Sequence, residues 1–121
     1  MPLFLRFNNQ LTLKHMQYAI HYFLHLIFPI VLAFFIDKNH WLRVYLILLA
    51  TMLVDLDHLF ATPLYNPCRC SIGFHPLHSY LAIGGYALLL IPKKTRIPAI
   101  GLLLHMLADS IDCLFIRQVC P

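Results

Sequence analysis

A short apolar stretch, MLVDLDHLF at residues 52–60, carries two carboxylates and an imidazole. A carboxylate that leaves water loses a large solvation energy, and proteins tolerate this when the charge is paired or bound to a metal. Imidazole and carboxylate together are a ligand set for zinc, manganese or non-haem iron. Asp55 and His58 are three residues apart and share a helix face, whereas Asp57 does not. We therefore expect a divalent cation beside Asp55 and His58, with Asp57 ligating it or orienting a ligand.

Three other apolar stretches also carry ionisable side chains at helical spacing. They are His21 and His25, then His75 and His78 around Pro76, and finally His105, Asp109 and Asp112. At a rise of about 1.5 Å per residue, an up-and-down bundle would bring them to one depth, opening toward the loop at 62–75. The expected cofactor is one or two divalent ions, with zinc preferred and manganese or iron as alternatives. The predicted metal ligands are His21, His25, Asp55, His58, His78, His105, Asp109 and Asp112.

Three residues near these ligands are predicted to be catalytic. Arg69 is the one positive charge in the loop YNPCRCSIGFH and could hold a phosphate or carboxylate of a substrate, or simply contact lipid headgroups. Asp57 and His75 could ligate the metal, orient its ligands or act as a general base.

Composition indicates that membrane helices position these residues. The 121 residues are 60% hydrophobic and 12% charged, and the mean hydropathy is +0.74. A run of about 20 apolar residues can cross a bilayer, and four runs fit, at residues 18–36, 41–61, 76–91 and 97–116. The sequence predicts an all-α, polytopic integral membrane protein, a four-transmembrane-helix bundle that forms a single domain over residues 1–121. The expected location is the bacterial inner (cytoplasmic) membrane.

The basic residues flank the apolar runs, so the net charge of +4 indicates membrane lipid rather than nucleic acid as the partner. Lys and Arg are almost evenly divided between the two sides, and the KKTR turn favours a cytoplasmic position for that turn with both termini outside. A signal peptide is the competing interpretation of the first run, but it would need a shorter apolar core and a small-residue cleavage site.

The four cysteines leave several states open. Cys68 and Cys70 could form a disulfide with Cys113 or Cys120 if their side of the membrane lies outside the cytoplasm. Loop thiols without a function and a structural zinc site are the alternatives. The sequence does not decide the oligomeric state.

Three motifs resemble a known family. VDLDH at 54–58, HPLHS at 75–79 and HMLAD at 105–109, with a histidine in the first helix, resemble the membrane-bound metal-dependent hydrolases of the YdjM-like family. RCSIGFHPLHSY and HMLADSIDC are more similar to a small bacterial membrane protein family of unknown function. The resemblance covers residues 20–115 and implies metal-dependent hydrolysis without naming a substrate. Val54 stands where the hydrolase pattern has proline, and the second histidine pair is more closely spaced.

The leading hypothesis is an integral-membrane metal-dependent hydrolase in which metal-activated water attacks a phosphoester or acyl bond of a lipid or lipid-linked substrate. The alternative is a membrane protein that binds metal for transport or sensing without catalysis. Structural hydrogen bonding between helices and haem ligation are weaker readings, because haem would leave the carboxylates unused. A metal-free serine hydrolase is disfavoured because no G-x-S-x-G motif occurs.

Overall fold

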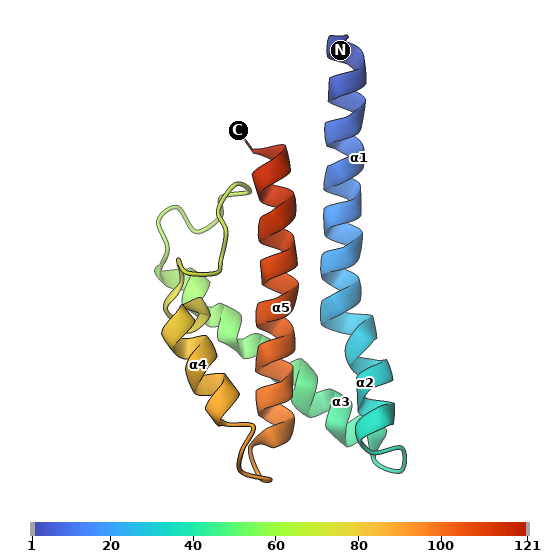
Figure 1. Cartoon of the computed structure of the whole chain (residues 1–121), viewed down its shortest axis with the longest axis vertical. Coiled ribbons are helices and arrows are strands. Elements are labelled where there is room, and N and C mark those ends of the chain that lie inside the picture. Colours follow the sequence, from blue (N-terminus) through green and yellow to red (C-terminus); the bar gives the residue numbers. More distant parts are fainter. Residues whose placement is uncertain (1, 121) are drawn as a thin grey trace.

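The computed structural model of the chain describes residues 2–120 and is all-helical. Two long helical rods run side by side, and α1 begins at the same end of the molecule at which α5 finishes (Figure 1). The first rod runs from α1 (Leu3–Tyr22) through a π-helical turn, η1 (Phe23–Ile27), into α2 (Phe28–Ile36). The second rod is α5 (Arg96–Val119).

Two shorter helical segments lie between the rods along the chain. α3 (Trp41–Ala50) continues into the 3₁₀ helix η2 (Thr51–Phe60). After a loop, the 3₁₀ turn η3 (Pro76–His78) precedes α4 (Tyr80–Leu88). α2 packs on α3, and α5 packs on α1, α3 and α4, so α5 is the central element that the others surround.

The all-α class is confirmed, but the predicted bundle of four membrane-spanning helices is wrong. Among the described residues, two helices are long and apolar enough to cross a membrane, Leu5–Ile36 and Arg96–Val119. α4 has nine residues and is therefore about 14 Å long, less than half of a hydrocarbon core of about 30 Å. The predicted span at 41–61 has ten α-helical residues before the winding changes. The apolar composition overestimated the number of spans, because it does not report where α-helical hydrogen bonding ends.

The first helix also begins earlier than the predicted residue 18. Residues 3–17 contain several polar side chains but no proline or glycine, so nothing in this stretch ends a helix. The first rod therefore extends about four turns beyond the apolar run.

A small apolar core joins α2, α3 and the start of α5. Its buried centre is formed by Ala33, Val44 and Leu48. Gly101 of α5 lies against α3, where an added Cβ would be 3.3 Å from the Leu48 Cα and 2.7 Å from the Thr51 Cγ2. The close approach of α5 to α3 therefore depends on glycine at this position.

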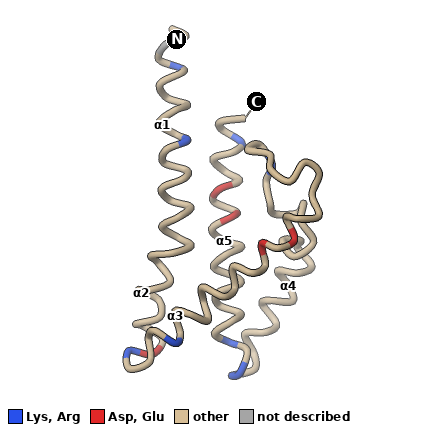
Figure 2. Tube along the Cα trace, turned by 180° about the vertical axis from the view of Figure 1, so that it is seen from behind, with Lys and Arg blue, Asp and Glu red and all other residues tan. Residues whose placement is uncertain are grey.

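Charged residues are unevenly distributed along the molecule. Lys and Arg lie toward the two ends of the long axis, whereas the acidic residues, apart from one in the α2–α3 turn, lie at intermediate heights on α5 and on the segment after α3 (Figure 2). The carboxylates thus gather where the sequence offers few cationic side chains, and they need another partner.

Candidate metal centre

Four potential ligand atoms from three segments converge on one point. They are Asp55 Oδ1 of η2, His78 Nε2 of η3, and His105 Nε2 and Asp109 Oδ2 of α5. The five separations that involve an imidazole nitrogen are 3.0–3.3 Å. A tetrahedron of ligands about 2.0 Å from zinc has edges of about 3.3 Å. This set, which we call the four-atom cage, therefore has the dimensions of a tetrahedral metal site.

One atom of the cage has no hydrogen-bond partner. His78 is fully buried, and Asp109 Oδ2 is a buried oxygen without a hydrogen-bond partner. Burial alone would lower the pKa of His78, but the neighbouring carboxylates of Asp109, Asp55 and Asp57 raise it to about 10. The carboxylates thus hold a proton on the imidazole where a cation would otherwise sit. A divalent cation would replace that proton and neutralise the carboxylates, so the residues fit a metal.

The 3₁₀ winding of η2 lets both of its carboxylates face the centre. In an α-helix, residues two apart point about 160° away from each other, whereas in a 3₁₀ helix the angle is about 120°. Asp55 Oδ1 accordingly reaches the cage, and Asp57, which is 3% exposed, points to the neighbouring turn η3. The winding that shortens the predicted membrane span therefore also positions the site.

Asp57 holds the imidazole of His78 in place. Its Oδ2 accepts hydrogen bonds from His78 Nδ1 at 3.0 Å and from the backbone N–H of Leu77 at 2.8 Å. Its Oδ1 lies 3.1 Å from His58 Nδ1. An Nδ1–H bond to a carboxylate fixes the tautomer that presents Nε2 to a metal, as commonly found around protein metal sites. Asp57 is therefore a positioning residue for His78.

A second group of ligand-type atoms faces the other side of Asp109. It consists of His21, His25 and Asp109. His25 Nε2 lies 3.5 Å from Asp109 Oδ1, and the His21 and His25 ring centroids are 4.4 Å apart. His21 Nδ1 lies 3.8 Å from Asp112 Oδ1, so the predicted ligand Asp112 borders this group without belonging to it.

The π-helical turn η1 places His25. Pro29 has no N–H with which to bond the carbonyl of His25, so ordinary α-helical bonding fails at this point. The N–H of Phe28 bonds instead to the carbonyl of Phe23, and the Tyr45 hydroxyl donates to the carbonyl of Leu26 at 3.2 Å. Single π-helical turns are frequent at functional sites because they redirect a side chain.

A third group is formed by Asp57, His58 and His75. The predicted ligand His58 lies beside the cage rather than in it, because its Nε2 bonds to Ser71 Oγ at 3.2 Å and its Nδ1 contacts Asp57. The rings of His58 and His75 are 3.8 Å apart. Burial, followed by the neighbouring His58, lowers the pKa of His75. His75 is therefore neutral at pH 7 and can accept a proton.

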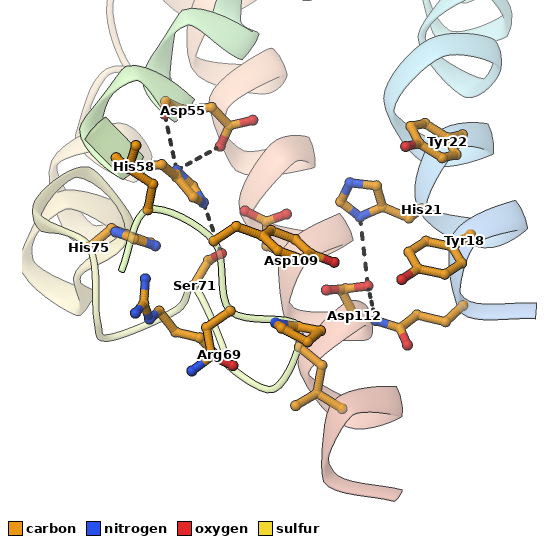
Figure 3. A pocket seen from close by; sticks show the side chains of 16 residues that line it. Tyr18, His21, Tyr22, Asp55, His58, Arg69, Ser71, His75, Asp109 and Asp112 are labelled. Carbon is orange, nitrogen blue, oxygen red and sulfur yellow. Dashed lines mark hydrogen bonds and ion pairs between the residues drawn. The ribbon is translucent and has the colours of Figure 1, made fainter. Parts of the chain in front are cut away.

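A cavity of about 280 Å³ opens beside these groups. Asp55, Asp109 and His21 line one part of it, and Arg69 and His75 line another (Figure 3). The Nη1 of Arg69 donates to the Pro63 carbonyl at 2.7 Å, and the guanidinium lies 4.7 Å from the centre of the Phe74 ring. These contacts fix the guanidinium at the cavity while leaving most of its five N–H donors for a ligand.

Two disulfides attach the loop of residues 61–75 to the C-terminal half of α5. They join Cys68 to Cys120 and Cys70 to Cys113, with Cα–Cα distances of 5.7 and 5.0 Å. The cysteines are therefore paired, rather than being free thiols or a structural zinc site. This attachment holds Arg69 and Ser71 over the cavity.

Two polar residues that the sequence analysis did not single out belong to the site. Gln17 donates to Asp112 Oδ1 at 2.8 Å, and Ser71 contacts His58. Gln17 lies four residues before His21 on the same helix face, which is a signal that could have identified it. Ser71 reaches the site through the loop, and no periodic pattern indicates it.

Comparison with known families places the chain in one of them. The model of a family of unknown function, DUF6122, matches residues 15–116. The chain belongs to this family. The matched range includes all three groups of ligand-type residues. No curated protein and no solved structure matches the chain.

Proposed function

We propose that this DUF6122 protein is a metal-dependent hydrolase of the bacterial inner membrane that acts on phosphoester or acyl bonds of lipid or lipid-linked substrates. The observation that carries the proposal is the four-atom cage, whose separations of 3.0–3.3 Å fit zinc, with manganese or iron as alternatives. The motif resemblance to the YdjM-like hydrolases supports the same chemistry.

A divalent cation supplies Lewis-acid polarisation and a water of lowered pKa when it is bound. The side chains around it have separate tasks. Asp57 keeps the Nε2 of His78 directed at the cage. His75, neutral and at the cavity wall, is suited to accept a proton from the attacking water. Asp55 connects the cage to the cavity, because its side chain is 41% exposed while those of the two cage histidines are almost fully buried.

Arg69 makes a phosphoester the preferred substrate. Its guanidinium is fixed at the cavity by Pro63 and Phe74, and a planar fork of N–H donors matches the oxygens of a phosphate. A neutral acyl ester offers no comparable partner. The free N–H donors of Arg69 would thus bind the phosphate group of the substrate.

The membrane location rests on the two long apolar helices, Leu5–Ile36 and Arg96–Val119. The segment that joins these helices along the chain also exposes apolar side chains such as Leu53, Phe60 and Leu81. Their exposure favours contact with lipid. Disulfides persist in oxidising compartments, so the loop of residues 61–75 and the cavity would lie outside the cytoplasm. This agrees with the orientation favoured by the KKTR turn.

Metal transport is the weaker alternative. The end of the bundle opposite the cavity is closed by the apolar core of Ala33, Val44 and Leu48. An ion path would need polar side chains to continue through this region. A site that ends at an apolar core is better suited to catalysis or sensing.

The proposal is tested with the purified full chain in detergent, loaded with zinc. Release of inorganic phosphate from a short-chain phosphatidic acid is followed beside release of fatty acid from a short-chain phosphatidylcholine. We expect phosphate release, and a decrease in kcat/KM of about 10–100-fold in Arg69→Ala, because a hydrogen-bonded charge contributes about 1.5–3 kcal/mol. Arg43→Ala, which changes an exposed arginine on α3, is the matched control. A zinc-loaded protein that cleaves neither lipid would contradict the hydrolase assignment. Metal sensing would then be the remaining candidate function.

A further inference from the structure

We propose that the centre binds two cations, the second held by His21, His25 and Asp109 with Asp109 bridging the two positions. The inference rests on the proposed metal centre and extends it. The cage offers four protein ligands and the second position offers three, and both border the cavity.

The two oxygens of Asp109 face different groups. Oδ2 lies 3.0 Å from His78 Nε2 and 3.3 Å from His105 Nε2, inside the cage. Oδ1 lies 3.5 Å from His25 Nε2 on the opposite side. One carboxylate thus presents one oxygen to each position, the arrangement by which a carboxylate bridges two ions.

The histidines of the second position are prepared for a ligand. His25 is 5% exposed, and its ring lies 4.4 Å from that of His21 and 4.6 Å from that of His105. His21 Nδ1 is buried and has no hydrogen-bond partner. One potential ligand atom from each of His21, His25 and Asp109 lies within 4.8 Å of the others. The local break in α-helical bonding at η1 is what directs His25 to this point.

Charge also favours a second cation. The site holds four of the five acidic residues of the chain, namely Asp55, Asp57, Asp109 and Asp112. Arg69 is the cation at the cavity wall. With neutral histidines, a single divalent ion leaves one net negative charge, which would repel a phosphate. Two divalent ions leave one net positive charge, which would attract it.

The two metal positions differ in the number of protein ligands that they offer. The cage supplies four protein ligands, the number typical of structural zinc, whereas catalytic zinc has three and keeps one position open. The second position has three ligand residues, and two of them, His21 and Asp109, line the cavity. Asp55 and Asp109 of the cage line the same cavity, so we assign the second position to a three-ligand ion that faces the substrate beside the cage ion.

The test counts Mn²⁺ ions bound to the purified full chain, by equilibrium dialysis and by the electron paramagnetic resonance spectrum. We expect two ions per wild-type chain with the signature of an exchange-coupled pair. In His21→Ala we expect one ion with an uncoupled spectrum. His21 is only partly buried, so this variant should fold, and His25→Gln provides a second removal of the same position. His15→Ala, an exposed histidine on the same helix, is the matched control and should keep two ions.

The outcomes separate the two proposals. One ion in the wild type, unchanged in His21→Ala and His25→Gln, would overturn the second position and leave the cage intact. No bound ion in the wild type would overturn the metal-dependent function as well. Two uncoupled ions would contradict the bridging role of Asp109.

Discussion

Replacement of Asp57 tests whether the cage is positioned by its neighbours. Asp57 lies outside the cage, but its carboxylate accepts hydrogen bonds from His78 Nδ1 at 3.0 Å and from the Leu77 N–H at 2.8 Å. In Asp57→Asn the amide oxygen can keep these bonds only without their charge. A hydrogen bond to a charged group contributes about 1.5–3 kcal/mol and a neutral one about 0.5–1.5 kcal/mol. The difference, about 1–1.5 kcal/mol, corresponds to roughly tenfold weaker metal binding.

Asp57→Ala removes every acceptor, and we expect about 100-fold weaker binding, the upper end of the range for outer ligands of metal sites. The assay is competition for Zn²⁺ with a chromophoric chelator, and circular dichroism reports the helical content of each variant. Asp37→Asn, an exposed carboxylate in the α2–α3 turn that pairs with His40, is the control and should bind zinc like the wild type. Unchanged zinc affinity in folded Asp57→Ala would refute the positioning role.

Three further predictions follow from packing, proton linkage and the disulfides. Gly101→Ala should lower the free energy of unfolding by about 1–3 kcal/mol in a thermal or denaturant melt, because the added Cβ would clash with Leu48 and Thr51. Gly84→Ala is the control and should be neutral or slightly stabilising, because nothing lies within 4 Å of its added Cβ. An equal loss in both variants would contradict the close α3–α5 contact. Zinc binding should release protons, because the cation replaces a proton on the His78 imidazole. The affinity for zinc should therefore fall as pH falls from 8 to 6. Calorimetry in buffers of different ionisation enthalpy should detect the released protons. A pH-independent affinity would contradict this exchange. A maleimide reagent should label none of the four cysteines before reduction and all four after it, and labelling of native protein would contradict the pairing of Cys68 with Cys120 and Cys70 with Cys113.

The residues of the site were accessible to sequence analysis because their chemistry conflicts with their surroundings. His105 and Asp109 are four residues apart on one helix, and the spacing alone predicts that both face one partner. The structure places them together with Asp55 and His78. His58 illustrates the limit, since its spacing from Asp55 is that of a shared face but its ring turns to Asp57 and Ser71.

The fold was harder to predict from the sequence than the site. An apolar run predicts burial in lipid or protein, but it does not report which hydrogen bonds the backbone makes. The π-helical turn at Phe23–Ile27 follows from the missing N–H of Pro29 together with the Tyr45 hydroxyl, and no residue pattern marks the change to 3₁₀ winding at Thr51. The predicted span at 41–61 was wrong for the same reason that Asp55 and Asp57 both reach the site, because 3₁₀ winding replaces the α-helix there.

The most direct measurement is the metal content of the purified protein, by elemental analysis after dialysis against metal-free buffer. The wild type should retain at least one zinc, manganese or iron ion per chain. His105→Ala and Asp55→Asn should each lose the cage ion while circular dichroism remains helical, and His40→Ala, an exposed histidine in the α2–α3 turn, should retain it. A metal-free wild type, or variants with undiminished metal, would contradict the four-atom cage as a metal site.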